Sequence, residues 1–305
     1  MRIVAALGGN ALLQRGESPD ATIQQHHIAR AVEALAPLVR AHEVVLTHGN
    51  GPQVGLLALE SDADPALHRP YTLDVLGAQT QGMIGYWLVQ ALHDAVPALA
   101  LAALVCQTVV RADDPAFSHP SKFVGQVYSK ELAEQLARER SWQIGRDGSG
   151  WRRVVASPMP QELVEASAIT RLVDAGTCVI CAGGGGIPVV RDQDGGLRGI
   201  EAVIDKDRTA ALLAELVGAQ ALLLLTDVPA VEIDFGTPAA RPIHRTSVAA
   251  LRGLAFPAGS MGPKVEAACD FTEVTGYTSA IGRIEDAEAL LSGSAGTIIQ
   301  RKDAS

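Results

Sequence analysis

The chain has 305 residues, of which 48% are hydrophobic and 19% are charged, so it is long enough for two domains or for one large α/β unit. Its formal net charge of −9 repels the nucleic-acid backbone and offers no polybasic run to a membrane, which leaves a small molecule as the expected partner. No apolar stretch reaches the ~18 residues of a membrane-spanning helix, and the N-terminus leads directly into glycines, which predicts a first strand and a cytoplasmic protein.

Apolar runs alternate with stretches of helical period along the chain, which is the pattern of a mainly parallel sheet covered by helices. We therefore expect a doubly wound α/β fold. The predicted elements, in chain order, are a strand at 3–7, a helix at 22–41, a strand at 43–47, a helix at 73–96, a strand at 100–105, a helix at 161–175, a strand at 177–182, a helix at 208–217, a strand at 221–226, a helix at 264–275 and strands at 278–281 and 297–299.

One segment, 111–160, interrupts this alternation. It is polar and rich in proline, serine and charge, with a turn signal in the Asp-Gly-Ser-Gly string at 147–150. The segment is either an inserted subdomain that acts as a lid or a long solvated excursion of the chain. A second polar stretch, 192–199, predicts the tip of a hairpin.

Glycine-rich loops follow three of the predicted strands. In open α/β sheets, ligands bind beyond the carboxyl ends of the strands, where these loops would converge. Glycine removes the side chain that would block close approach, and backbone N–H groups near a helix start hold phosphate oxygens. One such loop is typical of a tight turn, whereas three in succession indicate a cradle for an anion. Its residues are Gly8, Gly9 and Asn10, then Gly49, Asn50 and Gly51, and then Gly183, Gly184 and Gly185.

The cation that a phosphate site requires has to come from outside these loops. The chain has no Gly-Lys dipeptide, which excludes a Walker-type P-loop. Only five of its 25 basic residues are lysines. Lys206 lies between two carboxylates, Asp205 and Asp207, at a predicted helix start. Lys264 enters another predicted helix, so an ammonium group and a helix N-terminus would act on the same anion.

Each lysine also has a plainer interpretation. The Asp-Lys-Asp string at 205–207 is compatible with a helix N-cap and surface charges. Lys264 is compatible with an exposed first-turn lysine, although a positive charge is unfavourable at that end of a helix. Lys122, within the irregular insertion, is by itself typical of a surface.

Histidine and cysteine chemistry is weakly indicated. The chain has no H-E-x-x-H zinc pattern and no G-x-S-x-G nucleophile elbow, so hydrolytic chemistry is unsupported. His48 lies beside a glycine loop, where we interpret it as a packing or hydrogen-bonding residue rather than a proton carrier. Cys178 and Cys181 lie in a predicted strand that points their thiols to opposite faces, which indicates core packing.

Five strings along the chain resemble the motif series of the carbamate kinases, a group within the amino acid kinase family. Each string is moderately specific, whereas the ordered set, which spans nearly the whole chain, is highly specific. The strings are Ala-Leu-Gly-Gly-Asn-Ala at 6–11, Thr-His-Gly-Asn-Gly-Pro-Gln at 47–53, Ile-Cys-Ala-Gly-Gly-Gly-Gly-Ile-Pro at 180–188, Val-Ile-Asp-Lys-Asp at 203–207 and Gly-Ser-Met-Gly-Pro-Lys at 259–264.

The resemblance implies a three-layer αβα sandwich with a central, mostly parallel sheet and a small protruding subdomain at about 112–160. It implies one amino-acid-kinase domain over 1–305 that forms a homodimer. Residues 1–180 would bind carbamoyl phosphate or carbamate, and residues 181–305 would bind Mg²⁺ with ADP or ATP. The implied activity is reversible phosphoryl transfer between carbamoyl phosphate and ADP, in a catabolic role such as the use of arginine or purine-derived nitrogen.

The same resemblance assigns roles to individual residues. The nine loop residues named above would surround the transferring phosphate. Lys122 would reach down from the protruding subdomain, and Lys206 and Lys264 would neutralise charge on the phosphoryl oxygens, with Asp205 orienting the lysines. No protein residue is expected as a direct ligand of Mg²⁺, which the nucleotide phosphates would hold. The nucleotide-binding residues implied are Thr226, Asp227, Val228, Met261 and Lys264.

Three differences from related patterns bear on the substrate. Ala6 stands where acetylglutamate kinases of the same fold have a lysine, which favours a carbamate-type site. The family usually reads Lys-Pro-Ile-Gly-Pro-Phe-Tyr where this chain has Lys-Phe-Val-Gly-Gln-Val-Tyr at 122–128, and Met159 replaces the lysine of a Ser-Pro-Lys-Pro string. We therefore expect the lid to grip its ligand differently. Two alternatives stay open: a kinase for another small carboxylate or carbamate-like acceptor, and a nucleotide-binding regulator without turnover.

Overall fold

A central sheet organises the computed structural model, which describes residues 1–14, 16–256 and 261–301. Within those ranges the sheet has eight strands, six of them parallel and two, β15 and β17, running in the opposite direction at one edge. The order across the sheet is β15 (Arg245–Ser247), β17 (Thr297–Gln300), β16 (Thr278–Arg283), β12 (Ala221–Thr226), β1 (Arg2–Leu7), β2 (Glu43–His48), β9 (Cys178–Ile180) and β3 (Leu101–Ala103).

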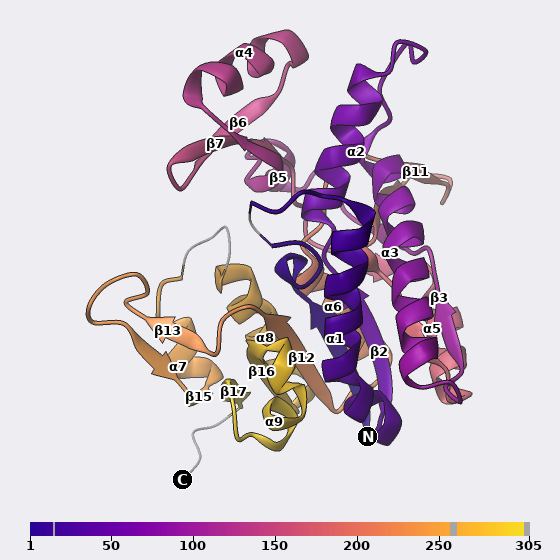
Figure 1. The fold of residues 1–305 in the computed structure, drawn as a ribbon, viewed down its shortest axis with the longest axis vertical. Coiled ribbons are helices and arrows are strands. Elements are labelled where there is room, and N and C mark those ends of the chain that lie inside the picture. Colours follow the sequence, from indigo (N-terminus) through magenta and orange to yellow (C-terminus); the bar gives the residue numbers. More distant parts are fainter. Residues whose placement is uncertain (15, 257–260, 302–305) are drawn as a thin grey trace.

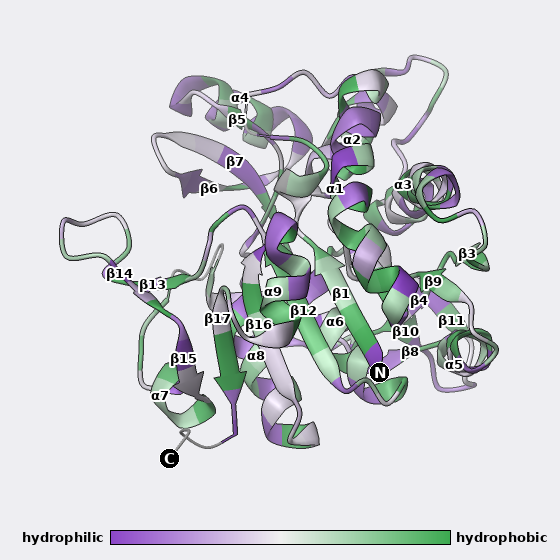
Figure 2. Ribbon diagram, turned by 60° about the horizontal axis from the view of Figure 1, so that its bottom comes forward, coloured by the Kyte–Doolittle hydropathy of each residue, from purple (hydrophilic) through white to green (hydrophobic). Residues whose placement is uncertain are grey.

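Helices cover both faces of this sheet, so that alternate strand residues are buried in two separate cores. Ile3, Ala5 and Leu7 of β1 pack on the side of α1 (Ala21–Ala41), α3 (Leu73–Ala95) and α9 (Ala287–Ser292). Val4 and Ala6 pack on the other side. Figure 1 shows the resulting layers, and Figure 2 shows that core strands such as β12 and β17 are largely hydrophobic. The predicted αβα sandwich is confirmed. The second helical layer consists of α5 (Ala166–Asp174), α6 (Lys206–Leu216), α7 (Val248–Arg252) and α8 (Met261–Thr275).

Two cysteines at the start and just past the end of β9 illustrate this alternation. Cys178 is buried in one core and Cys181, just beyond the strand, in the other, as the period-2 pattern predicts. Burial raises the pKa of the Cys178 thiol to about 12. Both cysteines are free, and we interpret them as packing residues.

Smaller sheets flank the sandwich. The stretch 192–199 contains the turn of an antiparallel hairpin, at 192–196, and its second strand, at 197–199, which confirms the predicted hairpin tip. The predicted helix at 161–175 is wrong at its start: residues 162–163 form a short strand, and the helix begins at Ala166. The edge of β4 offers backbone partners there, and Pro158 and Pro160 leave the preceding chain extended. These strands are β4 (Gln107–Val109), β8 (Glu162–Leu163), β10 (Ile187–Arg191) and β11 (Leu197–Gly199), with a separate hairpin of β13 (Val231–Ile233) and β14 (Arg241–Ile243).

Within the polar insertion, residues 122–155 form a separate three-stranded sheet with one helix, which we call the lid. It consists of β5 (Lys122–Tyr128), α4 (Lys130–Arg140), β6 (Gln143–Asp147) and β7 (Gly150–Val155). Ser129 begins α4 as an N-cap, because its hydroxyl accepts a hydrogen bond from the N–H of Leu132. Figure 1 shows the lid projecting from one end of the molecule, beside α2 (Gly51–Ala63).

Helix α2 was not predicted, because its first residues, Gly51 and Pro52, are typical of a loop. Proline is tolerated in the first turn of a helix, where its missing N–H would have no intrahelical partner. The helix therefore starts inside the second glycine loop. No helix in the described ranges is long and apolar enough to cross a membrane.

Candidate functional site

The three glycine loops meet at the carboxyl edge of β1, β2 and β9, which are neighbours in the sheet. Gly8 N–H donates to Leu225 O at 2.9 Å, and Gly49 N–H donates to Leu7 O at 3.0 Å. A Cβ atom on Gly49 would lie 3.0 Å from the nitrogen of Gly9. The first two loops are thus held against each other by backbone contacts that a side chain would obstruct. The side chain of Asn10 lies outside the described part of the chain.

The third loop, η3 (Gly183–Gly185), lies against side chains of the second. A Cβ on Gly183 would come within 2.2 Å of the His48 ring. A Cβ on Gly184, whose φ is +65°, would come within 2.2 Å of Asn50 Nδ2, and that amide in turn donates to Thr80 Oγ1 at 2.9 Å. Glycine is required at Gly183 because of the close approach, and at Gly184 because of both the close approach and the left-handed backbone.

A cavity of about 1020 Å³ opens above these loops. Two of the predicted loop residues, Gly183 and Gly185, are buried and do not line the cavity wall. All other predicted site residues with described side chains line it, although they come from segments up to 256 residues apart, from Gly8 to Lys264. These residues are Gly8, Gly9, Gly49, Asn50, Gly51, Lys122, Gly184, Asp205, Lys206, Thr226, Asp227, Val228, Met261 and Lys264.

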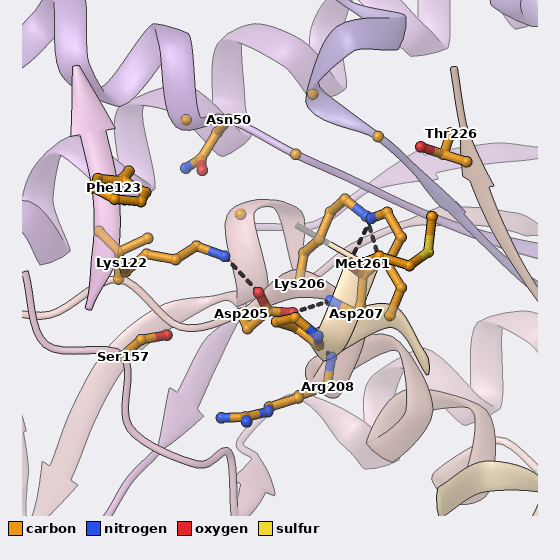
Figure 3. A pocket seen from close by; sticks show the side chains of 18 of the residues that line it. Asn50, Lys122, Phe123, Ser157, Asp205, Lys206, Asp207, Arg208, Thr226 and Met261 are labelled. Carbon is orange, nitrogen blue, oxygen red and sulfur yellow. Dashed lines mark hydrogen bonds and ion pairs between the residues drawn. The ribbon is translucent and has the colours of Figure 1, made fainter. Parts of the chain in front are cut away.

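Asp205 connects the lid to the start of α6. One oxygen accepts from Lys122 Nζ at 2.5 Å, and the other accepts from the N–H groups of Asp207 and Arg208 at 2.9 and 3.4 Å, which makes Asp205 the N-cap of the helix. Figure 3 shows Lys122 extending from β5 across the cavity to this carboxylate. Burial by itself would raise the pKa of Asp205, but the nearby Lys122 ammonium outweighs it and the pKa lies below its ordinary value.

Asp207 pairs with the other two lysines. Its Oδ1 accepts from Lys206 Nζ at 2.5 Å and its Oδ2 accepts from Lys264 Nζ at 2.7 Å, so one carboxylate holds two ammonium groups. The side chain of Asp207 is only 5% exposed. The resemblance assigns the orientation of the lysines to Asp205, whereas in the structure Asp205 contacts Lys122 and Asp207 contacts Lys206 and Lys264. Sequence reasoning named the Asp-Lys-Asp string but did not distinguish the two carboxylates.

The environment of Lys206 weakens its hold on its proton. Burial is the main cause, and the nearby Lys264 ammonium acts in the same direction, whereas Asp207 opposes both. The pKa of Lys206 is lowered to about 8. For Lys264, burial also acts to lower the pKa, but Asp207 outweighs it, and the pKa is raised above its ordinary value. The two lysines of one carboxylate therefore differ in how readily each releases a proton.

His48 is a neutral part of the cradle. Burial lowers its pKa to about 4, although its hydrogen bond to Gly49 acts in the opposite direction. Its Nδ1 atom lies 3.0 Å from Gly49 O, so this nitrogen carries the ring proton and donates it to the carbonyl. The geometry agrees with the packing and hydrogen-bonding interpretation of this residue.

The far side of the cavity is lined by the end of β12 and the start of α8. Thr226 Oγ1 donates to Asp227 Oδ1 at 3.1 Å, and Met261 and the aromatic rings of Phe235 and Phe256 line the same wall. Phe235, which sequence reasoning did not single out, is 68% exposed on the loop between β13 and β14. Gly259 and Ser260 of the fifth string lie outside the described residues.

A resident metal site is not apparent in the described ranges, where no group of three or more histidine, cysteine, aspartate or glutamate side chains is arranged to hold an ion. Both carboxylates at the floor of the cavity, Asp205 and Asp207, are occupied by lysines. The arrangement supplies three ammonium groups and backbone N–H groups to one cavity, which suits a ligand with several anionic oxygens.

Comparison with known proteins gives a consistent result. A model of the amino acid kinase family matches residues 1–281. The chain is 49% identical to a carbamate kinase of Rhizobium meliloti over 98% of this chain and 93% of that one, and 43% identical to a carbamate kinase of Thermococcus kodakarensis over 99% of both. The solved structure of a Giardia lamblia carbamate kinase bound to AMP-PNP is similar, with a TM-score of 0.88 and 38% identity over 98% of both chains.

Proposed function

The chain belongs to the amino acid kinase family, and on this premise we propose that it is a carbamate kinase. The reaction is reversible phosphoryl transfer between carbamoyl phosphate and ADP, which yields ATP and carbamate. The observation that carries the proposal is the convergence of Lys122, Lys206 and Lys264 on one cavity floored by the glycine loops. Full-length similarity to carbamate kinases from bacteria and archaea supports the choice of substrate.

The chemistry requires positioning and charge neutralisation rather than a protein nucleophile. A terminal phosphate oxygen of ADP attacks the phosphorus of carbamoyl phosphate, and the bond from that phosphorus to the carbamate oxygen breaks. During this transfer negative charge shifts over the phosphoryl oxygens. Lys206 and Lys264 are held 2.5 and 2.7 Å from the two oxygens of Asp207. From there they present their ammonium groups to the phosphoryl oxygens. Backbone N–H groups of the glycine loops orient the same phosphate.

Lys122 completes the site from the lid. Its ammonium group is held by Asp205 across the cavity, and we infer that a bound phosphoryl group competes with Asp205 for this cation. Magnesium would enter with the nucleotide, because Asp205 and Asp207 are already paired with lysines; when bound, it would neutralise charge on the nucleotide phosphates. The walls formed by Thr226, Asp227, Val228 and Met261 would then hold the nucleotide.

The proposal assigns the two ligands to different halves of the chain, as the resemblance implies. Residues 1–180, including the subdomain at about 112–160, would bind the carbamoyl group, and residues 181–305 would bind the nucleotide. A cytoplasmic homodimer in a catabolic pathway belongs to the same proposal. Support for the dimer comes from β3, an edge strand of the central sheet, beside which Tyr86 and Val105 are 56% and 51% exposed.

The first test is ATP formation from carbamoyl phosphate, ADP and Mg²⁺ by the purified protein, followed with luciferase after contaminating kinases have been removed. We expect ATP to form only when all three components are present. Phosphorylation of another small carboxylate, trapped as its hydroxamate, without ATP from carbamoyl phosphate would replace this substrate with a different acceptor. Tight Mg-ATP binding without any transfer would indicate the regulator instead.

The proposed role of Lys206 makes an alkaline pH limit an expected outcome. In the free enzyme this lysine loses its proton as the pH rises through about 8, and with it the charge that binds the phosphoryl oxygens. We therefore expect kcat/KM for carbamoyl phosphate to fall above pH 8, whereas kcat should hold to higher pH because bound phosphate favours the protonated lysine. The effect of pH on stability is opposite to its effect on kcat/KM. Between pH 8 and the ordinary pKa of 10.5, Lys206 binds more protons in the unfolded chain than in the folded one, so its contribution to the free energy of unfolding rises with pH.

Steady-state pH profiles of the wild type and of Lys206→Arg check this expectation. The guanidinium group stays protonated, so the arginine variant, although slower, should lack the decline near pH 8. A wild-type kcat/KM that is flat to pH 10 would show that Lys206 keeps its proton in the free enzyme.

A further inference from the structure

Trp142 in the lid lies against two arginines. The guanidinium carbon of Arg140, the last residue of α4, lies 5.2 Å from the centre of the Trp142 ring, and that of Arg153 in β7 lies 5.1 Å from it. Both distances fall within the range of cation–π attraction. The ring therefore restricts both arginines, which come from different elements of the lid. We call these three residues the arginine clamp.

Each arginine of the clamp forms an ion pair with a carboxylate outside the lid. Arg140 Nη1 lies 2.6 Å from Asp62 in the last turn of α2, and Arg153 Nη2 donates to Glu201 Oε1 at 3.2 Å. The side chain of Arg153 is 19% exposed, and burial lowers its pKa from its ordinary value. These ion pairs differ from the exposed ones elsewhere on the surface because their arginines are partly dehydrated and stacked on an aromatic ring.

Glu201 belongs to the segment that leads into the catalytic residues. Its second oxygen accepts from the N–H of Leu73, the first residue of α3, at 2.8 Å. Four residues later the same segment reaches Asp205, the partner of Lys122. Between them, Val203 N–H donates to Ala156 O, just beyond β7, at 3.0 Å. One short segment thus contacts the lid, the start of α3 and the cavity.

The base of the lid is packed closely against α2 and against the segment that contains Val203. Val124 and Val155 of the lid are buried with Val203 in one apolar cluster. Gly125 in β5 approaches Gly55 in α2 so closely that a Cβ on Gly55 would lie 2.2 Å from the Gly125 Cα. The lid is therefore held by apolar contacts and by the ion pair of Arg153. Because Arg153 is paired with Val124, and Val155 with Lys122, a shift of β7 would displace β5 and the ammonium group of Lys122.

We propose that Glu201 and Arg153 are positioning residues, whose ion pair, braced by Trp142, holds Lys122 over the site of phosphoryl transfer. The proposal rests on the proposed carbamate kinase reaction. Neither residue lines the cavity, so neither touches substrate. A small misplacement of a catalytic group is enough to lower turnover by an order of magnitude or more, and the clamp controls the orientation of the element that carries Lys122.

The test is Glu201→Gln, which removes the charge but keeps an oxygen for the N–H of Leu73. We expect kcat for ATP formation to fall about tenfold while KM for ADP changes less than twofold, because the clamp acts through Lys122 rather than on the nucleotide wall. Arg153→Gln should give the same loss, and the double variant should be no slower than either single one. Glu162→Gln, which breaks the exposed pair with Arg191 away from the lid, is the matched control and should leave kcat unchanged.

The decisive comparison uses the Lys122→Ala background. If Glu201 acts by positioning Lys122, Glu201→Gln should cost no further activity there. A wild-type kcat in Glu201→Gln, or the same fold-loss with and without Lys122, would overturn the proposal.

Hydrogen exchange separates a failure of the clamp from a failure of the proposed reaction. In Glu201→Gln, amides of β5 and β7 should exchange faster than in the wild type, whereas those of β1 and β12 should not change. Absence of ATP formation by the wild type would reject the reaction but leave this measurement valid. Unchanged exchange in β5 and β7 would reject the clamp even in an active enzyme.

Discussion

Lys264→Ala is expected to lower kcat for ATP formation by about a hundred- to a thousandfold, in line with the loss of one preorganised donor to a developing anion. The ammonium group is 2.7 Å from Asp207 Oδ2 and faces the cavity beside Lys206. Its raised pKa keeps it protonated across the neutral range, so its loss removes a permanent charge. The other two lysines of the cavity, Lys122 and Lys206, are already paired with Asp205 and with the other oxygen of Asp207.

Luciferase detection of ATP measures this loss, and circular dichroism verifies that the variant is folded. Lys130→Ala is the matched control, because Lys130 is 60% exposed and forms only an i,i+4 pair with Glu134 in the lid helix. We expect the control to keep wild-type turnover. A Lys264→Ala protein that also turned over at the wild-type rate would remove Lys264 from the mechanism.

Asp207→Asn is expected to impair both catalysis and stability. Removal of this carboxylate leaves two buried ammonium groups without their counter-ion, which costs about 3–5 kcal/mol of the free energy of unfolding when a buried pair is broken. The pKa of Lys206 should fall further, because Asp207 is the group that opposes its burial. We expect kcat to fall by about a hundredfold, since the geometry of both lysines depends on the same two oxygens.

Urea unfolding and steady-state assays at pH 7 give the two effects separately. Asp113→Asn serves as the control, because Asp113 pairs with Arg111 on the surface, where the side chains are 72% and 66% exposed. The free energy of unfolding of Asp113→Asn should stay close to that of the wild type, because an exposed pair contributes little to stability. A stable and active Asp207→Asn protein would show that the lysines are positioned without this carboxylate.

The cradle could be derived from the sequence because the same local pattern, an apolar strand followed by a glycine loop, occurs three times. Each glycine loop follows an apolar strand, and parallel strands bring their carboxyl ends to one edge, so Gly8, Gly49 and Gly184 had to lie near one another once the sheet was inferred. The two-core burial of β1 follows from the same period of two. Lys206 stood out because it lies between two carboxylates at the start of a helix.

Other parts of the site depend on contacts between distant segments, which no local pattern records. Residues 122–155 carried no strong periodicity, because a small sheet with one solvated face buries too few apolar residues to show it. Glu201 and Arg153 each have the appearance of an ordinary surface charge until the lid brings them 3.2 Å apart. The start of α2 was obscured because Gly51 and Pro52 are typical of loops.

By itself, the sequence indicated the α/β class, a glycine cradle at the carboxyl edge and two lysines beside it, Lys206 and Lys264, because these follow from strand period, glycine sterics and the rarity of lysine in this chain. The expected role of Lys122 came only from the resemblance to the carbamate kinases. Only the tertiary structure decided which carboxylate holds which lysine. Asp205 turns its side chain back to cap α6 and reaches Lys122, while Asp207, two residues further around the helix, faces Lys206 and Lys264. That choice depends on the direction of each side chain in the first helical turn and on the arrival of β5 and α8 from elsewhere in the chain.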